Sequence, residues 1–585
     1  MRVVRRTSVL LAGALVASGI ALLPAQADET SDPTTLAVEG TVRAVVVDRF
    51  GDEAASDHLF TVVTDAGAEI PVDLPEATPA NGRFDGELVV DGDVEAALDA
   101  KDLLPREGST IAEDTRAGRV AVSAAERQDA PLEVAEWTVA PVAAAAVTTP
   151  AAHRAYVAIM TNRGSVEESP AQVKALVDQM ASYWTTESGG AIRSFDVQGD
   201  VATFQSSAAG ATQQSCGMGS PNAVWNEARA QFPNVSFSTS SRNHLVVAMA
   251  DECSDGGIAG VASVGNDLSS GGPMSVTLGD IATQVGVHEM GHTFGLGHAN
   301  LDECPSTSTQ CGDGVYFDLF SPMALAVSAP RGQTDPFIVP ALDSAFRARL
   351  GVASTAEMPT MTTSGTITLA PRSDPTGVRG VQVVDPLTGV RYVVELRSGA
   401  GRDGGSFYAS PYVLGGVPVR YDPGVTVTTI SSNGTLTLLT RKATTPYDGA
   451  FAGGTTFTSP AGSTQIAVGP VSSAGTTVTV TLGAQAPPPA PVAPQKLAAA
   501  TPRISGTAKV GRTLKVKVGS WAPRPTFRYE WFANGRKISS KSTKASFRLT
   551  SRQKGKRITV RVTGTKAGYA TVSKTSRKTK EVLRS

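Results

Sequence analysis

The 585-residue sequence contains little cysteine and, beyond its N-terminus, no long hydrophobic run. No later segment reaches the roughly 20 apolar residues that a membrane-spanning helix needs, which excludes a transmembrane domain after the N-terminus. The sequence also lacks heptads and calcium-binding glycine–aspartate nonapeptide repeats, which excludes coiled coils and that class of repeat protein. Hydrophobic residues make up 41% and charged residues 18% of the chain, as in globular proteins. The length predicts three or four domains.

The N-terminus has the pattern of an export signal. A basic start with Arg2, Arg5 and Arg6 precedes the apolar stretch 8–23 and the small residues of 25–27. We therefore expect residues 1–27 to be a signal peptide and the protein to be secreted, extracellular and possibly associated with the cell wall. A membrane anchor and twin-arginine export are the alternatives, but the apolar stretch is short for a span.

The four cysteines, Cys216, Cys253, Cys304 and Cys311, lie in one part of the chain. In an exported protein an even number of cysteines favours two disulfides over a thiolate metal site. Three pairings are possible. Because neighbouring cysteines close the shorter loops, Cys216–Cys253 and Cys304–Cys311 are the preferred pairs.

Composition divides the rest of the chain into domains. Residues 28–147 carry 26 acidic and 8 basic side chains and alternate Val/Leu/Thr stretches with turns, which predicts a small β-rich domain. The Ala/Val/Pro/Thr run 139–152 predicts a linker and a processing site. Residues 148–352 mix helix and strand patterns, and 353–485 show strands only, as in a β-sandwich. A Pro-rich linker, 486–500, precedes a second, smaller β-sandwich over 501–585, with a tight turn at Asn534–Gly535.

Within 148–352 the predicted elements alternate. Residues 156–160 and 245–250 are typical of buried strands. Ser169 is a suitable N-cap for a helix that starts at Pro170. Further helices are predicted over 221–232 and 281–294, and the segment 335–350 closes the unit.

Three of the six histidines fall within eleven residues, in the run His288-Glu289-Met290-Gly291-His292-Thr293-Phe294-Gly295-Leu296-Gly297-His298. His288 and His292 are four apart and lie one above the other on a helix. Gly295 can adopt the left-handed conformation that ends a helix, which would turn His298 back towards them. Three imidazoles and one open position describe a catalytic zinc site.

Glu289 follows a ligand directly and is the expected general base. Zinc lowers the pKa of water to roughly 7, so that Glu289 can take its proton while the metal polarises a peptide carbonyl. The alternatives are three core histidines without a metal, and a site that binds zinc without catalysis. An aminopeptidase with a glutamate as third ligand is disfavoured by the spacing of His298. Another alternative is a cell-surface or wall-binding protein on an inactive scaffold.

The eleven-residue run resembles the signature of the metzincin clan of zinc peptidases, over roughly residues 153–352 and in particular the gametolysin-like and reprolysin-like bacterial branches. The resemblance implies a multidomain protein with an α+β metzincin catalytic domain, an N-terminal β-rich prodomain and C-terminal β-sandwich domains. It implies one catalytic Zn²⁺ and protein or peptide substrates; structural Ca²⁺ is left open.

The clan also has a methionine-containing turn beneath its metal. Residues 316–323, which end in Ser321-Pro322-Met323, match that turn, which makes Met323 a non-ligating base under the imidazoles. Astacins and serralysins place a tyrosine two residues further on, and here that position is Leu325. We therefore expect no tyrosine oxyanion partner of that kind. Ala299, directly after the last ligand, leaves the subfamily unassigned.

In metzincins an extended substrate pairs with an edge strand upstream of the zinc helix, and residues 258–264 are the candidate here; a buried central strand is the alternative. Residues 28–147 take the place of an inhibitory propeptide and have no cysteine, which excludes a cysteine-switch thiolate. Asp52 might ligate zinc instead, but a turn aspartate is the simpler interpretation. Cleavage between about 138 and 153 is expected to activate the enzyme.

Charge is unevenly distributed along the chain. Residues 501–585 have 23 Lys or Arg against 2 Asp or Glu, whereas residues 28–500 have 26 against 52. Residues 501–585 resemble an immunoglobulin-like module of actinobacterial surface proteins. Their charge of +21 predicts binding to anionic cell-wall polymers, with a solvated basic spacer as the alternative. Since no base-reading motif is present, no nucleic-acid binding is expected.

Overall fold

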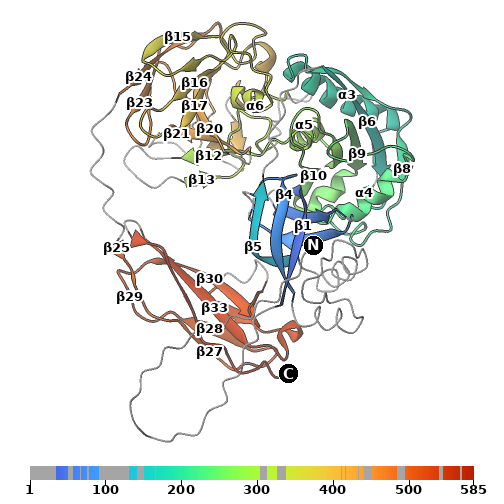
Figure 1. Ribbon diagram of the computed structural model, residues 1–585, viewed down its shortest axis with the longest axis vertical. Helices are drawn as coiled ribbons and strands as arrows, with labels where there is room; N and C mark the ends of the chain where they lie inside the picture. Colours follow the sequence, from blue (N-terminus) through green and yellow to red (C-terminus); the bar gives the residue numbers. More distant parts are fainter. Residues whose placement is uncertain are drawn as a thin grey trace, which may run out of the picture. The chain divides into compact units, whose positions relative to one another are not determined.

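The computed structural model describes most of the chain outside the N-terminal 33 residues (Figure 1). The described ranges are 34–49, 57–65, 67–75, 78–90, 131–140, 150–164, 166–303, 312–325, 338–409, 412–414, 417–419, 421–431, 434–440, 449–483, 495–538, 544–566 and 569–584. The predicted signal peptide lies outside them. The chain forms two compact units, Met1–Ala484 and Gln485–Ser585, which divide just before the proline-rich stretch. Among the described residues no helix has the length and apolar character to cross a membrane.

The first unit contains an eleven-stranded sheet shared by two parts of the chain (Figure 1). Its strand order is β2-β3-β5-β4-β1-β10-β11-β9-β6-β7, with β8 paired to β6. Five strands come from the acidic N-terminal region: β1 (Thr34–Arg49), β2 (Asp57–Thr64), β3 (Glu69–Asp73), β4 (Arg83–Val90) and β5 (Leu132–Ala140). The other six follow in sequence: β6 (Ala151–Met160), β7 (Ile192–Val197), β8 (Ala202–Phe204), β9 (Asn243–Met249), β10 (Ile258–Ser263) and β11 (Gly272–Thr277).

The five N-terminal strands close on themselves, because β1 pairs with both β2 and β4 while β5 pairs with both β3 and β4. Their inward side chains form a separate apolar core that includes Val38, Phe60 and Phe84. The end of β1 extends beyond this small barrel and pairs antiparallel with β10, from Val45↔Ser263 to Arg49↔Ile258. One 16-residue strand thus joins the N-terminal domain to the sheet of the next domain.

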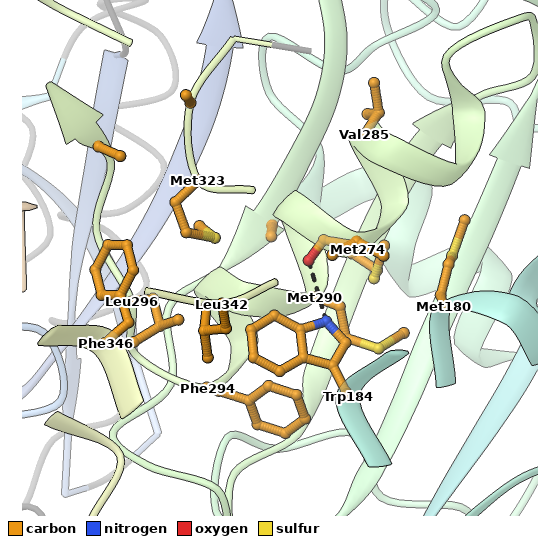
Figure 2. Close-up of a cluster of buried hydrophobic side chains, with 14 of the residues drawn as sticks. Met180, Trp184, Met274, Val285, Met290, Phe294, Leu296, Met323, Leu342 and Phe346 are labelled. Atoms are coloured by element: carbon orange, nitrogen blue, oxygen red, sulfur yellow. Dashed lines mark hydrogen bonds between the residues drawn. The ribbon is translucent and has the colours of Figure 1, made fainter. Parts of the chain in front are cut away.

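Helices cover both faces of the larger part of the sheet. On one face lie α3 (Pro170–Glu187) and α5 (Ala282–Thr293), and on the other α4 (Asn222–Arg229) and the short 3-10 helix η2 (Asp251–Gly256). The predicted start of α3 is confirmed, since Ser169 and Gln172 form a capping box and Pro170 is the first helical residue. Figure 2 shows the core beneath α5, where the Trp184 indole donates a hydrogen bond to the Val287 carbonyl (3.1 Å).

Several predicted boundaries were wrong at their ends. The predicted helix over 221–232 is only the eight-residue α4. The segment 335–350, which was expected to close the unit, contains the helix α6 (Ser344–Arg349), and its residues 335–337 lie outside the described residues. The expected linker over 139–152 overlaps β5 at one end and β6 at the other. These strand ends could not be recognised in the Ala-rich sequence, because alanine has a low propensity for β-strands. Ala151 is part of a strand because it pairs with Ile192 of the neighbouring strand.

The rest of the first unit is built from two sheets that enclose a common apolar core, as expected of a β-sandwich. The four-stranded sheet consists of β15 (Gly365–Leu369), β24 (Thr476–Leu482), β23 (Thr464–Val468) and β22 (Thr456–Thr458). The seven-stranded sheet consists of β13 (Gly312–Gly314), β12 (Ala299–Glu303), β21 (Leu436–Thr440), β20 (Gly424–Ile430), β17 (Arg391–Arg397), β16 (Val381–Val384) and β14 (Thr360–Met361). A separate hairpin pairs β18 (Tyr412–Leu414) with β19 (Val417–Val419), and the 3-10 turns are η3 (Gly401–Asp403) and η4 (Phe407–Ala409). Two strands of the larger sheet, β12 and β13, directly follow the histidine motif.

Buried ion pairs also connect these two halves of the first unit. The Glu187 carboxylate, at the end of α3, binds Arg372 Nη2 (2.9 Å) and Arg402 Nη1 (2.7 Å) from the β-sandwich. Arg372 and Glu187 are almost completely inaccessible to solvent. Breaking a buried pair strands an uncompensated charge, so the two halves are not independent.

The described part of the second unit consists mainly of β-strands around Trp531, which is fully buried. Its two main sheets are β27 (Arg503–Ser505), β28 (Thr513–Lys517) and β32 (Ser546–Arg548), and β31 (Arg536–Lys537), β30 (Thr526–Ala533), β33 (Ile558–Thr565) and β35 (Val572–Thr575). Two short pairs complete it, β25 (Gln495–Lys496) with β34 (Tyr569–Ala570) and β26 (Ala498–Ala499) with β29 (Trp521–Ala522). A 3-10 turn, η5 (Ser551–Gln553), precedes β33. The predicted turn at Asn534–Gly535 joins β30 to β31, and both residues have positive φ.

Candidate metal centre

The helix α5 carries two of the predicted ligands and ends in the predicted glycine turn. Gly295 has φ +82°, its N–H bonds the His292 carbonyl (2.8 Å), and the Leu296 N–H bonds the Gly291 carbonyl (3.1 Å). These two bonds are those of a Schellman motif, which reverses the chain after a helix. A side chain at Gly295 would lie 2.7 Å from the Gly265 carbonyl oxygen, so the turn requires glycine for space as well.

Backbone carbonyls fix the orientation of two imidazoles. His288 Nδ1 donates to the carbonyls of Pro322 and Ala324 (both 3.1 Å), and His292 Nδ1 donates to Leu296 O (2.7 Å). A carbonyl can only accept, so the proton of each neutral ring sits on Nδ1 and the Nε2 lone pair is left for a metal. The Schellman turn therefore both redirects the chain and holds a ligand.

The three predicted ligand histidines converge on one buried point together with Asp48. One donor atom from each of the four residues lies within 4.8 Å of all the others. Asp48 Oδ2 is 3.0 Å from His288 Nε2 and 3.5 Å from His292 Nε2, and Asp48 Oδ1 is 3.0 Å from His298 Nε2. His288 Nε2, His292 Nε2 and Asp48 Oδ2 nevertheless have no hydrogen-bond partner of acceptable geometry. Of the three histidines only His298 forms a hydrogen bond with Asp48, from Nε2 to Oδ1 (3.0 Å), which leaves two imidazole nitrogens and one carboxylate oxygen unpaired within the same small space.

This donor set fits a divalent metal ion. Asp48 and Glu289 are both buried, and among the described residues neither has a lysine or arginine as an ion-pair partner. Burial lowers the pKa of His298 to about 3, so its ring is neutral and cannot compensate the carboxylates. A buried negative charge needs a counterion, and three imidazole nitrogens with a carboxylate oxygen are ligands suited to zinc.

Glu289 projects towards the same point from beneath the edge of β10. Burial, followed by the charge of Asp48, raises the pKa of Glu289 well above its ordinary value. Gly260 of β10 makes room for it, because a Cβ there would lie 2.1 Å from Glu289 Oε1. Glu289, the predicted general base, thus lies against β10, the strand that was predicted to pair with the substrate.

Asp48 is the site residue that the sequence interpretation missed. Asp52, the aspartate considered there, lies outside the described residues, and Asp48 is four positions earlier, at the end of β1. The available signal was a charged residue ending an apolar run, Ala44-Val45-Val46-Val47-Asp48, in which Ala44, Val46 and Val47 are buried.

The candidate substrate strand is β10, which is covered by β1. Asp48 pairs with Gly260, so that both face Glu289, and Val47 pairs with Val261 on the opposite face. Val47 is buried in the apolar cluster around the Cys216–Cys253 disulfide and Trp225. The strand β10 is therefore a central strand of the complete eleven-stranded sheet. Within the six strands that follow residue 150, however, it is an edge strand.

Met323 lies in a tight turn against α5, as its sequence position predicts (Figure 2). It is fully buried, and a Cβ at Gly291 would lie 2.4 Å from its sulfur. The Met323 carbonyl accepts a hydrogen bond from Ala299 N (2.8 Å), directly after His298. The turn of Met323 thus contacts the backbone of α5, which carries His288 and His292, and the start of β12, which follows His298.

The third ligand, His298, is held by the β-sandwich. The His298 carbonyl accepts from Leu436 N (2.8 Å), and the Gly297 N–H donates to Gly434 O (3.1 Å). From Ala299 onward β12 pairs in parallel with β21. Arg349 Nε, next to Gly434, donates to Gly295 O (3.1 Å). Residues of the β-sandwich therefore set the position of a ligand, a role that the sequence did not indicate.

A tyrosine also reaches the site, although not from the position known in astacins and serralysins. Tyr316 Oη donates to Asp48 Oδ1 (2.7 Å), and its ring lies 4.3 Å from that of His298. Leu325 occupies the position two residues past Met323, as expected, and lies at the end of the same turn.

One of the two preferred disulfides is present, Cys216–Cys253, which ties the segment before α4 to η2. Cys304 and Cys311 lie outside the described residues.

The chain was compared with known proteins. Residues 151–317 match the model of metallo-peptidase family M12. This match covers the sheet from β6, the helix α5 and all three histidines, which supports a metallopeptidase. No curated protein matches the chain.

The contact between Gly434 and the third ligand can be tested with two glycines. Both Gly434 (φ +89°) and Gly454 (φ +81°) are left-handed, but a Cβ at Gly434 would lie 2.8 Å from Arg349 Nε, whereas Gly454 has open space. We expect Gly434→Ala to weaken zinc affinity about tenfold, because outer contacts orient ligands, and Gly454→Ala to leave it unchanged. Affinity is measured by competition with a chelator. Equal affinities of the two variants would contradict the assignment.

Proposed function

We propose that this protein is a secreted zinc metalloendopeptidase of the metzincin type, made as a latent precursor. The observation that carries the proposal is the convergence of His288, His292 and His298 beside Glu289 in the part of the chain that matches the M12 peptidases. A zinc ion held by the three imidazoles would supply a Lewis acid that acidifies water and polarises a peptide carbonyl.

The residues around the ion divide the remaining work. Glu289 takes a proton from the attacking water, whose oxygen adds to the carbonyl carbon while the carbonyl electron pair moves to its own oxygen. The C–N bond then breaks, and the leaving nitrogen receives the proton from Glu289. The main chain of β10 orients the substrate by strand pairing.

Hydrolysis should depend on Glu289 and on the metal. In protein cut near residue 150, we expect Glu289→Gln to lower kcat for casein about 10²- to 10⁴-fold, because the amide cannot accept the proton. Zinc content measured by atomic absorption should stay unchanged, and a chelator should abolish wild-type activity. An inactive wild-type enzyme with bound zinc would favour the alternative, a surface-binding protein on a catalytically inactive scaffold.

Latency is explained by Asp48 and by the strand that carries it. Three protein nitrogens and one open position are the pattern of a catalytic site, whereas four protein ligands are the pattern of a closed, structural one. In the uncut chain Asp48 is the fourth donor, and β1 occupies the edge of β10. Asn81 strengthens this contact by donating to Val264 O (2.8 Å). Cleavage within 141–150 would leave β5 and β6 intact and allow the N-terminal domain to leave.

Loss of the Asp48 carboxylate should make the uncut chain leaky. We expect Asp48→Asn to raise the peptidase activity of uncut protein about tenfold or more, since a charged hydrogen-bonding partner contributes about 1.5–3 kcal/mol. The matched control is Asp85→Asn, an exposed aspartate of β4. Activity is measured with a fluorogenic peptide, and electrophoresis verifies that the chain remains uncut. Equal, low activities of Asp48→Asn and wild type would rule out Asp48 as the inhibitory group, as would a wild-type precursor as active as the cut enzyme.

For the second unit we propose binding of an anionic, phosphate-bearing cell-wall polymer. Arg503 and Lys517 are direct cross-strand partners on β27 and β28. Like charges directly opposite each other destabilise a sheet. The pairing of Arg503 with Lys517 is therefore better explained by binding of an anion than by stability of the fold. Arg577 and Lys578 line the same hollow of about 830 Å³.

The four cations that line this hollow, which is called the groove below, form no ion pair with the two acidic residues of 501–585. The acidic residues of 501–585 are Glu530 and Glu581, and they pair with Lys537, Arg561 and Arg557 elsewhere. A phosphodiester offers two unesterified oxygens, which two adjacent cations can share. Among the described residues no aromatic side chain lines the hollow, which argues against base stacking and hence against single-stranded nucleic acid.

Two variants of the full-length protein with equal net charge distinguish binding in the groove from non-specific attraction by the overall positive charge of the unit. The groove variant replaces four lining cations by Gln: Arg503, Lys517, Arg577 and Lys578. The control replaces four exposed cations elsewhere on the unit by Gln: Arg512, Arg552, Lys554 and Lys556. We expect the groove variant to bind poly(glycerol phosphate) about tenfold more weakly and the control to change about twofold, both in a salt-dependent manner.

Equal losses in the two variants would indicate a solvated basic spacer with diffuse attraction. Tighter binding of single-stranded DNA or polyglutamate than of poly(glycerol phosphate) would contradict the assigned ligand. Binding is measured by fluorescence anisotropy at several salt concentrations.

A further inference from the structure

The structure assigns a catalytic role to Tyr316: we propose that its hydroxyl stabilises the oxyanion formed during peptide hydrolysis, once Asp48 has left. This inference rests on the proposed peptidase function and concerns a residue that the histidine motif does not include.

The first argument is the position of the phenol. Tyr316 Oη donates to Asp48 Oδ1 (2.7 Å), the same oxygen that lies 3.0 Å from His298 Nε2. A carboxylate oxygen at the metal position occupies space that a substrate carbonyl oxygen needs when β10 binds a peptide in place of β1. The Tyr316 hydroxyl, which donates to the carboxylate oxygen of Asp48, is therefore also in place to donate to the carbonyl oxygen of the substrate.

The second argument is that the neighbouring rings hold the phenol at the ligands. Its ring lies 4.3 Å from that of His298 and 6.3 Å from that of His288, and Tyr316 is almost completely buried. These ring contacts do not involve the N-terminal domain, so they remain to position the phenol when Asp48 departs. Donors that are already oriented cost no reorganisation during the reaction.

The third argument is the backbone of Tyr316, which has φ +66°. A left-handed conformation costs a non-glycine residue about 1–3 kcal/mol and persists where neighbours enforce it. Here Tyr316 N donates to Asn300 Oδ1 (2.9 Å), and Leu325 N donates to Tyr316 O (2.9 Å). The strain is maintained between the strand after His298 and the turn of Met323, both of which contact the ligands.

The chemistry required of Tyr316 is limited to hydrogen bonding. When water adds to the carbonyl carbon, the electron pair of the C=O bond moves to its oxygen, which becomes negatively charged. Tyr316 donates to this oxygen and keeps its proton. When the C–N bond breaks, the pair returns to form the new carboxyl group. The hydrogen bond is strongest while the charge is largest, which is the condition for lowering the barrier.

The test compares Tyr316→Phe with Tyr421→Phe in cut, zinc-loaded enzyme. Tyr421 donates its hydroxyl to the carbonyl of Phe317, the next residue to Tyr316, so its variant perturbs the same loop without removing a group from the site. We expect Tyr316→Phe to lower kcat about 100-fold with little change in KM. A phosphinic peptide that mimics the tetrahedral state should bind more weakly by the same factor, and Tyr421→Phe should change each value less than twofold.

A second readout uses uncut protein without added metal. Because Tyr316 also holds Asp48, Tyr316→Phe should speed proteolytic removal of the N-terminal domain, whereas Tyr421→Phe should not. The proposal is overturned if kcat and phosphinate affinity stay within twofold of wild type, or if KM and kcat change alike in both variants. If wild-type enzyme hydrolyses no peptide bond, the proposed peptidase function has failed instead.

Discussion

The structure depends on one electrostatic constraint: three imidazoles and the carboxyl groups of Asp48 and Glu289 are buried together, and no lysine or arginine among the described residues pairs with either carboxyl group. Such a group is costly in a low-dielectric interior unless a metal ion occupies its centre. The features around it serve this arrangement. Backbone carbonyls leave the Nε2 lone pairs of His288 and His292 free for a metal, and Gly260 leaves space for Glu289 beneath the sheet edge.

The ligands come from segments that different parts of the chain hold in place. α5 supplies two histidines, while the third follows a turn whose direction depends on hydrogen bonds to Gly434 and Leu436 of the β-sandwich. The N-terminal barrel supplies Asp48 through an extension of β1. The site is therefore shared by regions that composition divides into separate domains. The ion pairs of Glu187 with the buried Arg372 and the partly exposed Arg402 link two of these regions to each other.

The sequence predicted what local spacing and local conformation determine. The four-residue spacing of His288 and His292, the cap at Ser169 and the turn at Gly295 each depend on neighbours along the chain, and the structure agrees with them. Asp48, Tyr316 and Gly434 could not be found in that way. They reach the site across separations of 240, 28 and 146 residues from His288, through long-range contacts that no local pattern encodes. The Ala-rich ends of β5 and β6 were missed for the same reason.

The long strand β1 has a consequence for the edge of β10. Each residue from Val45 to Asp48 pairs with a main-chain position of β10 that would otherwise be an open edge. Open, apolar edges recruit other chains and promote aggregation. In the structure this edge is paired within the molecule, which blocks self-association through it. Removal of the N-terminal domain, as proposed above, would open the same edge to other extended chains.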